Sequence, residues 1–266
     1  MSMTGIKKGA DGFQLKIFAL IVMTIDHIHY FIPGMPIWMN YLGRLAAPIF
    51  LFLCVEGFGY TRSRSKYLLR MYIFSVVMKF TSMQLSLAFP RADNVAIMND
   101  MFSTMFVVCW CIEGIELLRG KVPGKRRGLG VLMLLVMVGS AAFVMSSMMV
   151  PVFPAWVTRL SFLFLPNPLT CEGSIMWVLL SIGFFYLRKR KRAVVILMAV
   201  FLLLGIGFTP LTAEYIVYNL CVFASVVPLC LYNGMPGKHR CKWLFYIYYP
   251  LHAYVLYLIG GQFVNL

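Results

Sequence analysis

Ionisable side chains lie inside two long apolar runs near the start of the chain. A short uncharged loop joins the two runs within residues 15–60, and the Asp, Glu, His and Arg residues that they contain are Asp26, His27, His29, Arg44 and Glu56. A charged side chain at the centre of a bilayer costs about 2.5–3.5 kcal/mol, so such residues normally face a protein interior or a wet cavity. Their concentration here predicts a chemical site rather than a simple membrane anchor.

Asp26 and His27 are residue types that move protons. A carboxylate beside an imidazole can fix the tautomer of the ring and raise its basicity. Neighbouring residues of a helix point about 100° apart, and Tyr30 lies one turn beyond both. We expect a catalytic or ligand-binding role for the pair, whereas the alternative for any membrane histidine is an interhelical hydrogen bond.

Arg44 and Glu56 belong to the second apolar run. Arg44 opens this run on the same side as Asp26, where it is either a partner in the chemistry or a structural counter-ion to Asp26. Pro48 cannot donate a hydrogen bond to the Arg44 carbonyl, which predicts a kink. Glu56 lies near the other end of the run, within reach of the basic residues 62–70.

The last apolar run carries a further histidine. His252 follows Pro250 in the sequence YIYYPLHAY, and a proline opens the hydrogen bonding of a membrane helix. Tyr249 offers a hydroxyl near this position. Lys79 in the third run and Asn99 at the mouth of the fourth complete the polar candidates.

The elements that must position these groups are membrane helices. The 266 residues are 61% hydrophobic and 12% charged, whereas soluble domains carry about 25% charged residues. Because a span needs about 20 residues, the sequence predicts an all-α polytopic membrane protein with one domain over residues 1–266 and no soluble domain. The nine apolar runs are residues 15–32, 41–60, 67–88, 101–118, 129–150, 173–187, 193–208, 213–232 and 242–262.

Basic residues cluster in alternate connections between these runs. All but four of the 24 Lys and Arg residues lie in the N-terminal segment, in every second connection, or within four residues of these at the edge of a run. Positive charge marks cytoplasmic connections, so we expect a cytoplasmic N-terminus and, with nine spans, an external C-terminus. Topology and lipid headgroup contacts account for the net charge of +15, and we expect no nucleic-acid partner.

Residues 151–170 do not fit this alternation as a span. They are apolar, but four prolines break helical continuity. We expect an outer-side interfacial or re-entrant segment, with a lid over a cavity as the alternative. No cleavable signal peptide is expected, because the first run contains Asp26 and lacks a small-residue cleavage site.

The seven cysteines predict neither a disulfide nor a metal site. Six lie in the runs or at the inner boundary, and only Cys171 falls on the outer side, where it has no cysteine to pair with. Cys109 and Cys111 point about 200° apart on a helix and cannot hold a metal together. We expect small buried side chains.

Three stretches resemble the TraX family of membrane proteins. They are LKIFALIVMTIDHI with its DH pair, YLGRLAAPIFLFLCVEGFGYTRSRSKYLLR with GRLA-x-P-x-F, EGF and TR, and LYNGMPGKHRCKWLFYIYYPLHAYVLYLI with an NG-x-x-G turn. The closing FYIYYPLH has one residue more between FY and YP than the family pattern. The resemblance covers both ends of the chain well and the middle poorly.

This resemblance implies an integral-membrane acyltransferase. The founding member of the family is associated with N-terminal acetylation of pilin, and the wider group includes heparan-α-glucosaminide N-acetyltransferase. Such proteins use cytoplasmic acyl-CoA, here expected to be acetyl-CoA, to acylate an acceptor on the far side of the membrane. The acceptor stays open between a protein N-terminus, a glycan and a small molecule, and the expected location is a bacterial inner membrane.

The resemblance also implies roles for individual residues. His27 would be the catalytic histidine and general base, and Asp26 its partner. The residues expected to support the reaction or bind the donor are Arg44, Glu56, Tyr30, Lys79, Asn99, Tyr249 and His252.

Two other classes of function compete with an acyltransferase. The same intramembrane Asp, His, Arg and Glu residues could form the proton relay of a proton-coupled small-molecule transporter. However, nine spans do not divide into two equal repeats, and no paired Gly- or Pro-interrupted spans occur in corresponding halves. A purely structural or assembly subunit would leave the buried charges unexplained.

Overall fold

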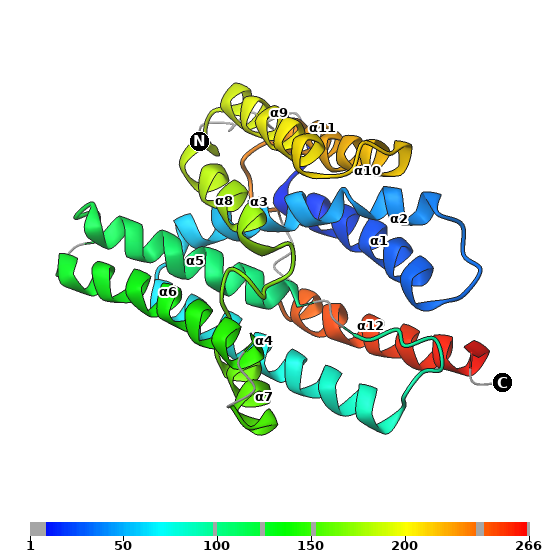
Figure 1. The fold of residues 1–266 in the computed structure, drawn as a ribbon. Coiled ribbons are helices and arrows are strands. Elements are labelled where there is room, and N and C mark those ends of the chain that lie inside the picture. The colour runs from blue at the N-terminus through cyan, green and yellow to red at the C-terminus, as the bar shows by residue number, and fades with distance from the viewer. Residues whose placement is uncertain (1–8, 98–99, 123–125, 150–152, 238–241, 265–266) are drawn as a thin grey trace. The chain divides into compact units, whose positions relative to one another are not determined.

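The computed structural model describes residues 9–97, 100–122, 126–149, 153–237 and 242–264 (Figure 1). Over these residues the chain is helical and contains no strand. The helices are α1 (Gly12–Phe31), α2 (Trp38–Gly43), α3 (Ala46–Tyr60), α4 (Arg64–Ala88), α5 (Met101–Leu118), α6 (Arg127–Met149), α7 (Ala155–Phe164), α8 (Ser174–Leu187), α9 (Lys191–Phe208), α10 (Ala213–Ala224), α11 (Val226–Leu231) and α12 (Lys242–Val264).

Each predicted apolar run coincides with helical structure. Six described stretches are long and apolar enough to cross a membrane, namely Trp38–Tyr60, Arg64–Ala88, Met101–Leu118, Arg127–Met149, Lys191–Phe208 and Ala213–Leu231. The described part of the chain therefore has the structure of an all-helical, multi-pass membrane protein. The count of nine spans and the orientation stay predictions.

Two of the predicted runs are interrupted where a proline removes a helical hydrogen bond. The break between α2 and α3 falls at Arg44, whose carbonyl would otherwise accept from residue 48, a proline. The break between α10 and α11 falls at Ser225. It directly follows Ala224, whose carbonyl would accept a hydrogen bond from residue 228 if that residue were not a proline. Pro250, in contrast, lies inside a continuous α12.

The described residues form two compact units. The first consists of the described residues within Met1–Leu53, Arg91–Val95 and Leu187–Leu266, and the second of those within Cys54–Pro90 and Ala96–Tyr186. Residues 91–95 connect α4 to α5, two helices of the second unit, yet they belong to the first. The stretches that resemble the TraX family lie in both units. The single-domain prediction for residues 1–266 stays a prediction.

In the first unit, α1 packs against α2 and α12, while α10 contacts α2 and α9. Asp11 caps α1, because its carboxylate accepts from the backbone N–H groups of Phe13 and Gln14 at 2.9 Å. Gly43 lets α2 approach α1 closely, since a Cβ there would lie 2.1 Å from Cβ of Asp26. The short α1–α2 distance is what brings the polar groups of the two helices together.

In the second unit, α5 packs against α4 and α6, which runs beside it in Figure 1. A partly buried ion pair joins α4 to α5, with Arg64 Nη1 2.9 Å from Oε2 of the buried Glu113. The predicted segment 151–170 contains α7, which ends before Pro166. In the loop that follows, the side chain of Asn167 donates to the Leu165 carbonyl and accepts from the backbone N–H groups of Leu169 and Thr170. The depth of this segment relative to a membrane stays a prediction.

Candidate active site

Two histidines from opposite ends of the sequence meet inside the first unit. His27 on α1 and His252 on α12 are both buried, and Nδ1 of His27 lies 2.7 Å from Nε2 of His252. Their rings are nearly parallel, with centroids 4.8 Å apart. The ring of Tyr248 stacks on His252, and Tyr249 lies beside both histidines. The structure thus brings together His27, His252 and Tyr249 of the predicted site residues.

The hydrogen bonds of this pair fix which ring nitrogens carry protons. Nδ1 of His252 lies 2.7 Å from the Tyr248 carbonyl oxygen, which can only accept, so Nδ1 of His252 is the donor. In the neutral ring Nε2 of His252 then carries a lone pair and accepts from Nδ1–H of His27. Nε2 of a neutral His27 is consequently the basic nitrogen.

Asp26 points away from this pair and is held by groups of α2 and the following break. Nη2 of Arg44 lies 2.6 Å and 2.5 Å from the two carboxylate oxygens, and Nδ2 of Asn40 donates to Oδ1 at 2.9 Å. The structure therefore does not show the expected contact in which Asp26 orients His27. The reason is the angle of about 100° between adjacent helical residues, which sends Asp26 toward α2 and His27 toward α12.

Arg44 links three helices of the first unit. Besides Asp26 it reaches Tyr218 on α10, whose hydroxyl lies 3.4 Å from Nη1 and whose ring centre lies 5.1 Å from the guanidinium. Its Nε donates to the Asn40 carbonyl at 3.1 Å. The geometry matches the counter-ion alternative, because the carboxylate of Asp26 and the guanidinium neutralise each other in a partly buried place.

The sequence pattern of the family described as "TraX protein" matches residues 11–260, which include both histidines and Asp26. The chain belongs to the TraX family. It is also 37% identical over 71 residues to a probable fimbrial assembly protein FimC, serogroup H1, of Dichelobacter nodosus. That match covers 25% of this chain and 29% of the relative. No solved structure matches the chain significantly.

The other predicted residues of this TraX-family protein lie elsewhere. Tyr30 is 41% exposed and packs on Phe31. Glu56 and Lys79 belong to the second unit. Asn99 lies outside the described residues.

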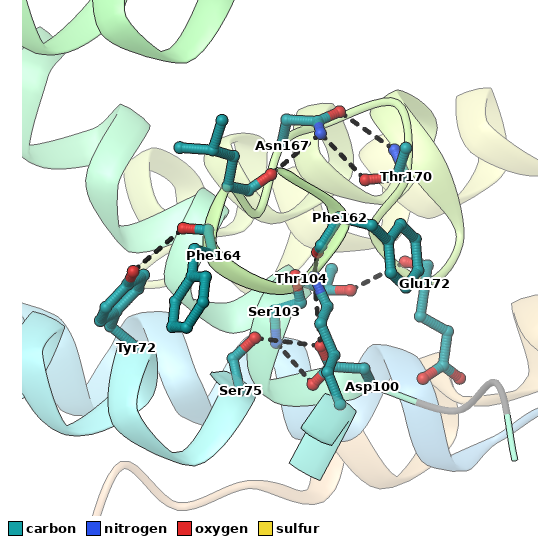
Figure 2. Close-up of polar contacts among 12 residues, drawn as sticks. Tyr72, Ser75, Asp100, Ser103, Thr104, Phe162, Phe164, Asn167, Thr170 and Glu172 are labelled. Carbon is teal, nitrogen blue, oxygen red and sulfur yellow. Dashed lines mark hydrogen bonds and ion pairs between the residues drawn. The ribbon is translucent and has the colours of Figure 1, made fainter. Parts of the chain in front are cut away.

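Lys79 belongs to a buried polar cluster of the second unit. Figure 2 labels other members of this cluster, among them Ser75, Asp100 and Phe162. Its Nζ donates to the Phe162 carbonyl at 3.1 Å and lies 3.8 Å from Oδ2 of Asp100. Asp100 caps α5 by accepting from the backbone N–H of Ser103 at 3.1 Å, and it accepts from Oγ of Ser75 at 3.0 Å. The cluster thus joins α4, the start of α5 and the end of α7.

Sequence reasoning on the TraX-family chain missed three buried charges, Asp100, Glu113 and Arg91. Asp100 had a usable signal, because an aspartate directly before a long apolar run is a typical N-cap. Arg91 looked like an ordinary loop charge. Among the described residues no group of three or more His, Cys, Asp or Glu side chains is arranged to hold a metal ion.

Proposed function

We propose that this TraX-family protein is an integral-membrane acyltransferase. It moves an acyl group, acetyl in the simplest case, from cytoplasmic acyl-CoA to an amine or hydroxyl on the outer side of the membrane. The observation that carries the proposal is the buried His27–His252 hydrogen bond of 2.7 Å, continued from His252 to the Tyr248 carbonyl. A chain of this kind presents one basic nitrogen at a defined place, as general-base catalysis requires.

In this mechanism Nε2 of His27 takes the proton of the acceptor N–H or O–H as that atom bonds to the thioester carbonyl carbon. The carbon–sulfur bond then breaks, and the proton passes from His27 to the sulfur of CoA. Nδ1–H of His27 donates to His252 throughout, and His252 remains anchored to Tyr248. The ring is thereby held in one orientation while Nε2 gains and loses its proton.

We propose a supporting role for Asp26 and Arg44 rather than contact with the reacting atoms. Arg44 is engaged by the carboxylate of Asp26, which reduces its capacity to stabilise a developing oxyanion. Together with Asn40 and Tyr218 the two residues hold α1, α2 and α10 in register. They fix the position of α1, and with it the position of His27.

A cavity in the first unit provides a place for the donor. It has a volume of about 600 Å³ and is lined by residues of the first half of α1 and of α11, including Leu15, Phe18 and Leu231. Such a volume is in the range of small-molecule sites, about 300–1,000 Å³. Phe18 lies nine residues before His27, or about 14 Å along α1. Nine residues also turn the helix by about 180°, so we propose that the pantetheine arm of acyl-CoA passes from this cavity around α1 to reach His27.

The proposed arrangement in the membrane has nine spans and a cytoplasmic N-terminus. The basic connections then form an inner surface that attracts the phosphates of CoA, with Lys191 next to the cavity through its contact with the Cys230 carbonyl. The proposed location is a bacterial inner membrane. Because the relative is named a fimbrial assembly protein, the N-terminal amine of a pilus or fimbrial subunit is the first acceptor to test.

The test uses inverted membrane vesicles of the native host, which present the cytoplasmic face to added acetyl-CoA labelled with radioactive carbon. His27→Asn keeps an N–H at the position of Nδ1 but has no basic nitrogen, so label transfer should fall about 10²- to 10⁴-fold. His29→Asn is the matched control, because the His29 ring contacts the loop carbonyl of Met35 rather than the histidine pair, and it should transfer label normally. Full label transfer by His27→Asn would contradict the assignment of His27 as the general base.

Donor binding is measured separately on purified protein in lipid nanodiscs. Acetyl-CoA at about 100 times its Kd should raise the stability of the folded protein by about 2.7 kcal/mol. Absence of any effect of acetyl-CoA, other acyl-CoAs and free CoA would remove the main support for a donor site. Proton-coupled uptake into proteoliposomes without an acylated product would then favour a transporter.

A further inference from the structure

Residues 91–95, between α4 and α5, contact the last residue of α1 and the C-terminal half of α12, the two helices that carry the histidines. Arg91, the first residue of this segment, has a side chain only 1% exposed. Its Nη1 donates to the carbonyl of Phe31 at 2.9 Å and to that of Tyr257 at 3.2 Å. Phe31 is the last residue of α1, and Tyr257 lies in α12. One guanidinium nitrogen therefore bridges α1 and α12.

The other side of the guanidinium is held by Asp93. Nη2 of Arg91 lies 2.6 Å from Oδ2 and Nε lies 3.0 Å from Oδ1, so the two groups pair in parallel. This fork geometry fixes the plane of the guanidinium as well as its position. The hydrogen bond from Arg91 also lowers the pKa of the Asp93 carboxyl below its usual value, so the pair stays charged at neutral pH.

The bridge lies about one helical turn from the histidine pair. Phe31 follows His27 by four residues and meets its ring edge-to-face at a centroid distance of 5.9 Å, and Tyr257 packs on Phe31 at 6.1 Å. Gly260 on α12 permits the approach, because a Cβ there would lie 1.9 Å from the Phe31 oxygen and 2.4 Å from Nη1 of Arg91. The two helices are thus held together next to the histidines.

A cation at this place is also favoured by the end of α1. The last carbonyls of a helix have no partner within the helix and carry partial negative charge. Arg91 satisfies one of them and cancels part of this charge. A water molecule could also donate to both carbonyls, but it carries no positive charge and is not held in place by Asp93, as the guanidinium is.

We propose that Arg91 is a positioning residue for the His27–His252 pair. By tying the Phe31 and Tyr257 carbonyls to one nitrogen, it sets the separation of α1 and α12 at which Nδ1 of His27 reaches Nε2 of His252. Asp93 keeps the guanidinium in the orientation that this requires. The effect of Arg91 on acyl transfer rests on the proposed function, whereas its effect on the geometry of the histidine pair does not.

The test observes the histidines directly, because the chain contains only four. Protein labelled with 15N-histidine in nanodiscs is studied by NMR, and single His→Gln variants assign the signals. In the wild type, His27 and His252 should both show the Nδ1–H tautomer. Arg91→Ala should convert His27 at least in part to the Nε2–H tautomer, whereas Arg91→Lys, which keeps a cationic donor, should restore the wild-type pattern.

Arg119→Ala is the matched control, because Arg119 is half exposed, pairs with Glu116 in the second unit and should leave all four signals unchanged. If Arg91→Ala does not fold, Arg91→Gln takes its place with the same expected change. A folded Ala or Gln variant with wild-type tautomers overturns the proposal. So does failure of both variants to fold, because Arg91 would then serve the whole fold rather than the pair.

The transfer assay distinguishes this proposal from the proposed function. Arg91→Ala should lower kcat for label transfer with little change in KM for acetyl-CoA, since the donor cavity lies at the other end of α1. If the tautomers change as expected but wild-type protein transfers no acyl group, the positioning role stands and the acyltransferase proposal falls. If the wild type is active but Arg91→Ala leaves the histidine pair unchanged, the positioning role falls and the acyltransferase proposal stands.

Discussion

The two nitrogens of His252 serve different partners, and amide side chains can replace them one at a time. In His252→Asn the amide nitrogen takes the place of Nδ1 and keeps the bond to the Tyr248 carbonyl, but the acceptor for His27 is lost. In His252→Gln an amide oxygen takes the place of Nε2 and can still accept from His27. This pair of variants separates anchoring from orientation.

We expect His252→Gln to retain more transfer activity than His252→Asn, by about tenfold, because one lost orienting hydrogen bond is worth about 1–1.5 kcal/mol. The measurement is the initial rate of label transfer in membranes with equal protein content. Equal loss in both variants would mean that His252 itself must carry a proton, as in a relay through both rings.

Asp100 is predicted to make the stability of the protein depend on pH. Burial raises the pKa of this carboxyl, which precedes the apolar part of α5, to about 6 from 3.8. Lys79 and the N–H and O–H groups of Ser103 and Ser75 oppose the rise only in part, and Cys171 lies nearby. A raised folded-state pKa means that the folded protein binds the proton more tightly than the unfolded chain.

The free energy of unfolding should therefore fall as the pH rises from about 4 to 6, by about 3 kcal/mol for a shift of this size, and then level off. Asp100→Asn keeps the cap of α5 and should lack this dependence. The measurement is unfolding of both proteins in mixed micelles from about pH 4 to 8. Parallel curves for the two proteins would contradict the assignment to Asp100.

At the scale of the helices, the close packing of α1 on α2 depends on Gly43. A Cβ at this position would overlap Cβ and Cγ of Asp26, at 2.1 Å and 2.4 Å. Gly43→Ala should destabilise the protein by about 1–3 kcal/mol, typical of overpacking, and lower transfer activity by displacing α1. Gly139→Ala, where a Cβ meets nothing within 4 Å, is the control and should be neutral or stabilising. Thermal unfolding in nanodiscs compares the two; equal melting temperatures would show that α2 can shift without cost.

Apolar length and proline positions predicted the helices well, because both act locally. The runs ended within a few residues of the observed helices, and the break at Arg44 agrees with the kink predicted from Pro48. The break at Ser225, near Pro228, was not predicted, because residues 213–232 were expected to form one run. Partners across the fold were predicted less well. Asp26 and His27 are adjacent in sequence, yet helical geometry sends them to different helices. Nothing in the sequence pairs His27 with His252, and nothing in it indicates that the loop charge Arg91 is buried between α1 and α12.

At the scale of the whole molecule, the proposed topology can be tested with single cysteines. Gly34 lies in the loop after α1 in open space, and Lys189 lies in the basic connection before α9. In intact spheroplasts a membrane-impermeant maleimide should label Gly34→Cys but not Lys189→Cys, and inverted vesicles should give the reverse. The parent protein, with its own cysteines, sets the background. The opposite pattern would invert the proposed orientation.

The separation of the two histidines along the chain has a consequence for biosynthesis. His27 and His252 are 225 residues apart, so at about 5–20 residues per second α1 is in the membrane for tens of seconds before α12 emerges from the ribosome. Asp26 and Arg44 are only 18 residues apart and can pair during that interval. The ion pair would then shield the charge of Asp26 from lipid while the nascent chain is inserted. The histidine pair can form only after α12 has been made, so the proposed base His27 gains its orienting partner long after it has entered the membrane.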